Sequence, residues 1–176
     1  MLSCFFCYIL FVNYDKDEQE KTKMEYEIVK LEEKVVMGFT ARTNNNSPQM
    51  GAVIGGLWEK FFGENGYAKI PEKKTGKTLG IYTDYASDAN GDYTVMTACE
   101  VTGVVSEEAK SLGMEVRKIP AGNYAKFVVK GDMQKAVAEA WQEIWKMDLK
   151  RSYGYDFEEY QNDDMENAEI HIYISL

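Results

Sequence analysis

The sequence predicts an α+β fold in which a β-α-β-β unit occurs twice and forms one antiparallel sheet with two helices packed on it. The order strand, helix, strand, strand is read over residues 24–104 and again over 113–176. The apolar residues of the two helices also correspond at a constant distance of 83 positions. Neither unit is large enough to bury its own sheet face, so the two must share one sheet. A ligand cleft is expected at the pseudo-twofold junction.

The two helices are predicted from apolar residues that recur at i, i+3 and i+4, which places them on one buried face. Ser47 supplies a cap before Pro48 in the first helix, and Asp132 supplies one in the second. The apolar face of the first helix comprises Met50, Val53, Ile54, Leu57, Trp58, Phe61 and Phe62, and that of the second comprises Met133, Val137, Ala140, Trp141, Ile144 and Trp145.

The strands are predicted from short apolar runs separated by turn-rich segments. The first unit contains one long strand over 25–41 and a strand pair over 79–86 and 93–103. The second begins with a strand over 114–131 that is interrupted by a Pro-Ala-Gly turn, and ends with a pair over 155–161 and 168–176. Cys99 lies in an apolar strand and is expected in the core.

Residues 1–23 are expected to form an extension outside the folded domain, which covers residues 24–176. The apolar run over 2–12 is shorter than the roughly 20 residues of a membrane span, and no basic residue precedes it as in a secretory signal. Cys4 and Cys7 form a single C-x-x-C without a second pair, and we assign them no function. The few cysteines and the absence of a disulfide framework favour a cytoplasmic protein with no membrane partner.

Charge and composition narrow the classes of function. The chain has 20 Lys and Arg against 29 Asp and Glu, for a net charge of -9, which disfavours general binding to nucleic acid. His171 is the single histidine, so His-rich zinc sites and any triad that needs another histidine are excluded. We therefore expect no metal and no cofactor, and chemistry that depends on carboxylates and on the 13% of residues that are aromatic.

The segment 155–160 carries the strongest functional signal, because three carboxylates are unusual in a short aromatic strand. Alternation puts Asp156, Glu158 and Tyr160 on one face and Glu159 on the other. One interpretation is an edge strand whose charges discourage aggregation. The other is a carboxylate that faces an aromatic cavity, where burial raises its pKa or requires a cation. Such a site suits an organic cation.

The motif P-A-G-N-Y-A-K-F over 120–127, then Gly131, the second helix and F-E-E-Y over 157–160 together resemble the GyrI-like, AraC/MerR-type effector-binding domain. L-G-I-Y-T-D-Y over 79–85 is similar to the third strand of that family. The resemblance covers essentially residues 24–176 and is closest to the stand-alone, integron-cassette effector-binding proteins. It implies a duplicated βαββ fold with a central pocket for hydrophobic, often cationic drugs and dyes.

The resemblance also implies site residues. The pocket glutamate of the family aligns with Glu158, and no catalytic residue is assigned on a binding module. If the face of Glu158 looks into the pocket, we expect the first-unit strand to present Leu79, Ile81, Thr83 and Tyr85 in the same orientation. The aromatic walls are then predicted to be Tyr85, Trp58, Trp145, Tyr124 and Tyr160. His171, on the strand face opposite its isoleucine neighbours, is expected to point to solvent or a partner.

Three functions remain open at this stage. Regulators of the family place a helix-turn-helix before the effector module, and no such segment precedes this one, so direct DNA binding is not expected. The first interpretation is a stand-alone small-molecule binding protein for a cationic or amphipathic ligand, acting alone or through a separate regulator. The second is a GyrI-like hydrolase with Glu158 as general base. The third is a protein inhibitor of DNA gyrase. A homodimer through free strand edges is compatible with each.

Overall fold

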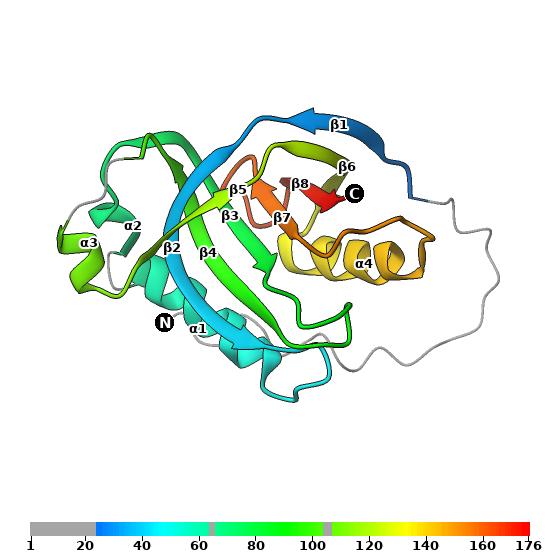
Figure 1. Ribbon diagram of the computed structural model, residues 1–176, viewed down its shortest axis with the longest axis horizontal. Helices are drawn as coiled ribbons and strands as arrows, with labels where there is room; N and C mark the ends of the chain where they lie inside the picture. The colour runs from blue at the N-terminus through cyan, green and yellow to red at the C-terminus, as the bar shows by residue number, and fades with distance from the viewer. Residues whose placement is uncertain (1–23, 64–65, 104–106) are drawn as a thin grey trace.

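The computed structural model describes residues 24–63, 66–103 and 107–176, and the prediction for residues 1–23 lies outside them. Within this part of the chain the β-α-β-β order occurs twice, as predicted (Figure 1). The first unit comprises β1 (Glu27–Leu31), β2 (Lys34–Thr43), α1 (Met50–Gly63), α2 (Gly66–Lys69), β3 (Lys73–Thr83) and β4 (Tyr93–Val101). After α3 (Glu107–Ser111), the second comprises β5 (Glu115–Ile119), β6 (Gly122–Gly131), α4 (Met133–Lys146), β7 (Tyr155–Tyr160) and β8 (Ala168–Ser175).

All eight strands form one antiparallel sheet in the order β1-β6-β8-β7-β3-β4-β2-β5. The two units meet where β7 pairs with β3. Each unit gives its first strand to the other, because β1 pairs with β6 and β5 pairs with β2. The single strand predicted over 25–41 is therefore wrong: the chain bends between Leu31 and Lys34, so that β1 pairs with β6 while β2 pairs with β4 and β5 (Figure 1).

Both long helices pack on the same face of the sheet, one on each half. The buried side of α1 lies against β2 and β4, and that of α4 lies against β6 and β8. The Asp132 side chain caps α4 by accepting a hydrogen bond from the backbone N–H of Lys135, as the sequence predicts. The first helix begins at Met50, just after a turn in which the Ser47 hydroxyl accepts from the N–H of Gln49.

The opposite face of the curled sheet holds a second core, which the sequence analysis did not predict. Its fully buried members include Leu79, Ile81, Met96, Tyr124 and Phe157. Strand β4, between β3 and β2, is buried along its whole length because it has a core on each side. Cys99 is buried there, as predicted. A strand residue of this protein can therefore be buried on either face, so burial alone does not identify the face that carries the site.

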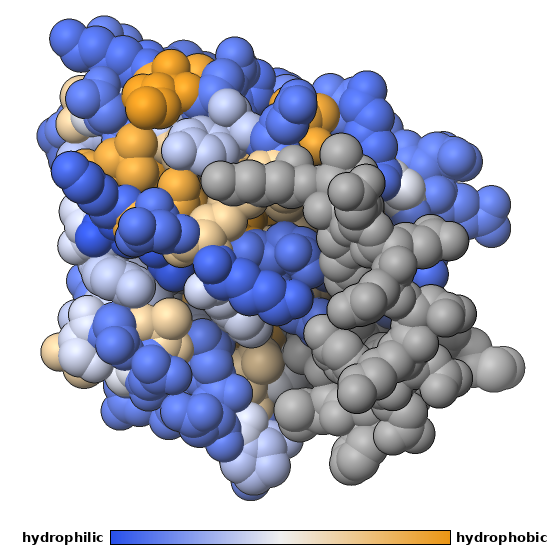
Figure 2. All heavy atoms as spheres, turned by 90° about the vertical axis from the view of Figure 1, so that its right-hand side faces the viewer, coloured by the Kyte–Doolittle hydropathy of each residue, from blue (hydrophilic) through white to orange (hydrophobic). Residues whose placement is uncertain are grey.

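The end of the molecule beside β1 and β6 is mostly hydrophilic, with hydrophobic residues gathered toward its upper side (Figure 2). Ile28 on β1 and Val128 on β6 are exposed hydrophobic residues of this edge. None of the helices in the described ranges is long and apolar enough to cross a membrane. The homodimer through strand edges stays a prediction.

Candidate functional site

The candidate site lies at the junction of the two units, on the face of β7 that is covered by the helices. Alternation along β7 directs Asp156 and Glu158 toward this face and Glu159 toward the other. In the pairing with β3, Glu158 lies opposite Gly80. A Cβ at position 80 would approach Glu158 Oε2 to 2.9 Å and Trp58 Cζ2 to 3.5 Å, so glycine leaves the space that the carboxylate occupies.

Three side chains donate hydrogen bonds to the Glu158 carboxylate. Its Oε1 accepts from the Tyr82 hydroxyl at 2.9 Å and from Trp141 Nε1 at 2.6 Å. Its Oε2 accepts from the Tyr160 hydroxyl at 2.7 Å. The donors come from β3, α4 and β7, so the fold fixes the carboxylate from three directions. Only 2% of Glu158 is exposed.

Burial raises the pKa of Glu158 above its ordinary value, although the three hydrogen bonds favour the charged form and oppose this shift. Burial and the neighbouring carboxylate also raise the pKa of Tyr82 and Tyr160 well above the usual value, so both hydroxyls stay protonated donors. Among the residues that the structure describes, no lysine, arginine or histidine forms an ion pair with Glu158. The buried acid is held in place but has no positive partner.

Aromatic rings surround this carboxylate. Trp58 on α1 meets Tyr160 edge-on with ring centroids 5.5 Å apart, and Trp141 on α4 meets Tyr82 in the same way at 5.2 Å. Trp58, Tyr82 and Tyr160 are partly exposed, whereas the carboxylate beneath them is buried. The arrangement can receive a ligand that presents apolar surface to the rings and positive charge to the acid.

A second buried acid on the same strand face has a cation of its own. Asp156 is fully buried, and its Oδ2 accepts from Arg151 Nη2 at 2.7 Å and from the Tyr85 hydroxyl at 3.0 Å. Its Oδ1 accepts from the N–H and the hydroxyl of Ser175 at 2.9 and 3.2 Å. Arg151 lies in the segment between α4 and β7, and its guanidinium packs on the ring of Tyr153. This cluster compensates the charge of Asp156.

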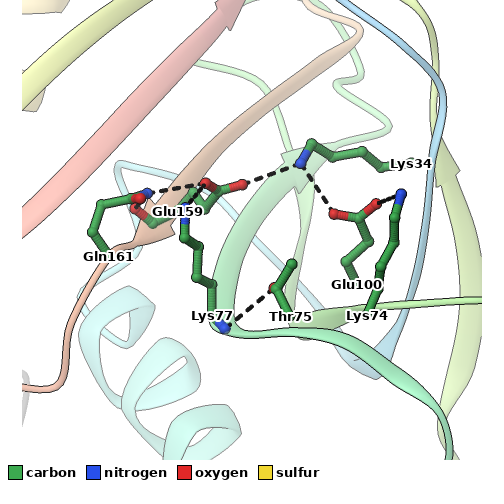
Figure 3. A network of polar contacts seen from close by, with 7 residues as sticks. All are labelled: Lys34, Lys74, Thr75, Lys77, Glu100, Glu159 and Gln161. Atoms are coloured by element: carbon green, nitrogen blue, oxygen red, sulfur yellow. Dashed lines mark hydrogen bonds and ion pairs between the residues drawn. The ribbon is translucent and has the colours of Figure 1, made fainter.

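The third acid of β7 points to the opposite face and belongs to an ion-pair network (Figure 3). Lys34 Nζ lies 3.2 Å from Glu159 and 3.1 Å from Glu100, and thus joins β7 to β4. Lys77 and Lys74 complete the network at 3.1 Å from Glu159 and 2.7 Å from Glu100. Burial raises the pKa of both acids, but hydrogen bonds and lysine charges outweigh it and lower the pKa overall.

The structure brings together half of the residues predicted for the site. The Tyr160 hydroxyl donates to Glu158, and the ring of Trp58 packs against that of Tyr160. Tyr85 lies on the same side but contacts Asp156 rather than Glu158. It reaches the cluster through Tyr93, whose ring centroid is 5.6 Å away.

Two predicted wall residues lie away from Glu158. Tyr124 lies in the core on the opposite face of the sheet, where its ring contacts Phe157 and its hydroxyl donates to the carbonyl of Pro120. Trp145 is 43% exposed and has no contact with Glu158; it lies beside Trp141, with ring centroids 6.2 Å apart. Trp145 follows Trp141 by four residues on α4, and this spacing leaves it at the outer border of the buried face of the helix.

Two site residues were missed, and the sequence carried a signal for one of them. Trp141 is the 83-residue counterpart of Trp58, so the repeat itself places the two tryptophans symmetrically about the junction. Tyr82 was missed because the phase assigned to β3 was wrong: Leu79 and Ile81 face the second core, and Gly80 and Tyr82 face Glu158.

The side chain of His171 is 16% exposed and its Nε2 lies 3.0 Å from Glu169.

Comparison with known proteins then establishes the family. The family model described as "integron-associated effector binding protein" matches residues 27–176. The chain belongs to this family. An integron cassette protein from the mobile metagenome of Vibrio cholerae is 31% identical, with 85% of this chain and 94% of that chain covered and a TM-score of 0.68. No functionally curated protein matches the chain.

More distant structures share the fold of this integron-associated effector-binding protein. A putative transcription regulation protein from Staphylococcus aureus is 20% identical over 87% of this chain and 99% of that one, with a TM-score of 0.63. The protein SAV2435, solved with tetraphenylphosphonium bound, is 22% identical over 86% and 94%, with a TM-score of 0.64. The resemblance to the GyrI-like effector-binding proteins is thereby confirmed, and small-molecule binding follows as the function of the family.

Proposed function

We propose that this protein binds a hydrophobic organic cation, with Glu158 as the counter-charge and aromatic rings as the walls. One observation carries the proposal. Of the three acids on β7, Asp156 is paired with Arg151 and Glu159 with two lysines, whereas Glu158 has no cationic partner among the described residues. It is nevertheless held by three donors that favour its charged form.

A buried acid without a cation is costly, because the charged form loses its hydration. A ligand cation that reaches this carboxylate supplies the missing charge and removes part of that cost. The walls favour an organic cation over a small hydrated ion, since each ring adds about 0.5–2 kcal/mol of cation–π attraction. Tyr82, Tyr160, Trp58 and Trp141 are the rings in position, with Tyr85 at the side.

The family and a structural neighbour both support the proposal. The family is one of effector-binding proteins, and SAV2435 was solved with a bulky aromatic cation. Rings that make mainly apolar contacts set few demands on ligand shape, so we infer that several cationic amphipaths bind, as in a multidrug site. The ligand is proposed to lie between α1 and α4, over the junction of β3 and β7.

Two ions of nearly the same shape and opposite charge test this proposal. We expect tetraphenylphosphonium to bind in isothermal titration calorimetry and to raise the melting temperature, because a ligand that binds only the native state stabilises it. Tetraphenylborate should do neither, since Glu158 repels it. Equal binding of both ions would show that the site recognises apolar surface alone, and the proposal would then be abandoned.

The raised pKa of Glu158 makes binding dependent on pH. A bound cation favours the charged carboxylate and lowers its pKa, so binding should release protons in the pH range between the pKa of the ligand-bound carboxyl and the raised pKa of the free one. Affinity should increase with pH across this range and then level off. Calorimetry in two buffers of different ionisation enthalpy measures the protons released. The opposite sign, or no proton exchange throughout the range, would contradict the assignment of Glu158.

A further inference from the structure

We propose that Arg151 is a second recognition point for the same ligand, at which its Nε donates a hydrogen bond to an uncharged acceptor such as a carbonyl or ether oxygen. The inference rests on the proposed function, because it assumes a cation at Glu158. It defines the ligand further: an organic cation that also carries a neutral acceptor.

The observation behind it is a buried donor without a partner. The Arg151 side chain is 7% exposed, and its Nη2 donates to Asp156 at 2.7 Å. Its Nε is buried and has no hydrogen-bond partner among the described residues. Buried polar atoms in folded proteins are nearly always paired, and a charged group that is not fully paired is especially costly. The unpaired Nε therefore indicates that an acceptor is supplied from outside the described part of the chain.

The position of Arg151 relative to Glu158 suits one elongated ligand. The partner of Arg151, Asp156, lies on the same strand face as Glu158. The two acids are two residues apart on β7, which corresponds to about 7 Å along the strand. Aromatic rings connect the two points: Tyr82 contacts Tyr93 at 5.8 Å between centroids, and Tyr93 contacts Tyr85 at 5.6 Å. A ligand body that lies along these rings can reach both polar points.

The charges of the cluster select a neutral acceptor. Asp156 already compensates the guanidinium, so the pair carries no net charge toward a ligand. An anionic group would meet Asp156 and Glu158 close by, and both would repel it. A carbonyl or ether oxygen meets no such repulsion and satisfies the donor.

Access to the guanidinium depends on Tyr153. Its ring lies over the guanidinium, 4.6 Å from Cζ to the ring centroid, and its side chain is partly exposed. Its φ of 53° is in the left-handed region, which is unfavourable for a residue with a bulky side chain. Displacement of the Tyr153 ring opens a path to the guanidinium, so the ligand approaches Arg151 from this side.

The test uses two phosphonium probes that differ in one group. The first is (4-phenylbutyl)triphenylphosphonium, and the second has a carbonyl in place of the methylene next to the phenyl ring. With the wild-type protein we expect the ketone to bind about tenfold more tightly in calorimetry. In Arg151→Lys, which keeps the charge opposite Asp156 and removes the planar Nε donor, the two probes should bind equally.

The outcomes separate the two proposals. If neither probe binds, the proposed function fails. If both bind wild type with equal affinity, the cation site stands and the acceptor site is wrong, as when a water molecule satisfies Nε. Should Arg151→Lys not fold, nitrogen-15 spectra of the arginine Nε–H groups in wild type replace it, with Arg42→Lys and Arg117→Lys used for assignment. Only the ketone should shift the Arg151 signal downfield, and an identical response to both probes would refute the inference.

Discussion

Glu158→Gln should weaken the binding of tetraphenylphosphonium by about tenfold to a hundredfold and leave the fold intact. The variant removes the negative charge that faces the ligand, and interactions with charged groups contribute about 1.5–3 kcal/mol. Glutamine keeps an oxygen that can accept from Tyr82 and Trp141, and the Tyr160 hydroxyl can rotate to accept from the new amide. Calorimetric titration of the variant measures the loss directly.

The matched control is Glu159→Gln, which makes the same change of charge at the next residue on the opposite face of β7. Its affinity for the cation should equal that of wild type, although the loss of pairing with Lys34 and Lys77 lowers its stability. If both variants lose affinity to the same extent, the net charge of the protein attracts the ligand and Glu158 has no special role.

The unliganded Glu158→Gln protein should be as stable as wild type at neutral pH, or more stable. A raised pKa means that the folded protein binds the Glu158 proton more tightly than the unfolded chain does. Its contribution to stability therefore falls as pH rises from the ordinary glutamate value through the raised pKa. The charged carboxylate is maintained for binding at a cost to folding, which is typical of functional sites.

The repeated architecture could be predicted because it depends on local patterns. Helical periodicity and the 83-residue correspondence define both long helices, and Asp132 acts as the predicted cap. The exchange of β1 and β5 between the halves could not be predicted, because it depends on which distant strands pair. The bend at Glu32–Glu33 lacks the Gly or Pro that usually marks a break, so the segment resembles one long strand.

The candidate site was predictable where one strand sufficed and not where two had to be aligned. Alternation within β7 selected Glu158 and Tyr160 without any knowledge of the neighbours. The face of β3 depends on the pairing of Gly80 with Glu158, and a shift of one residue exchanges Ile81 for Tyr82. Arg151 lies in an irregular segment with no periodicity, so only the folded chain brings it to Asp156.

Asp156→Asn is expected to lower the free energy of unfolding by about 3–5 kcal/mol, the cost of removing one partner of a buried ion pair. The carboxylate is fully buried and receives Arg151, Tyr85 and two donors of Ser175, so its replacement leaves the guanidinium as a buried charge without a counter-ion. Urea denaturation followed by tryptophan fluorescence measures the change. Glu33→Gln, which breaks the exposed pair with Lys118, should cost less than about 1 kcal/mol.

The comparison of two acids on one strand face makes this prediction informative about function. Asp156 and Glu158 are both buried, yet we expect the first substitution to damage folding and the second to damage only binding. The difference follows from Arg151, which supplies within the chain the positive charge that Glu158 lacks. Adding Arg151→Gln to Asp156→Asn should recover much of the lost stability, because no buried charge remains. If Asp156→Asn is harmless while Glu158→Gln unfolds the protein, then Glu158 is the structural acid and the cation site must be sought elsewhere.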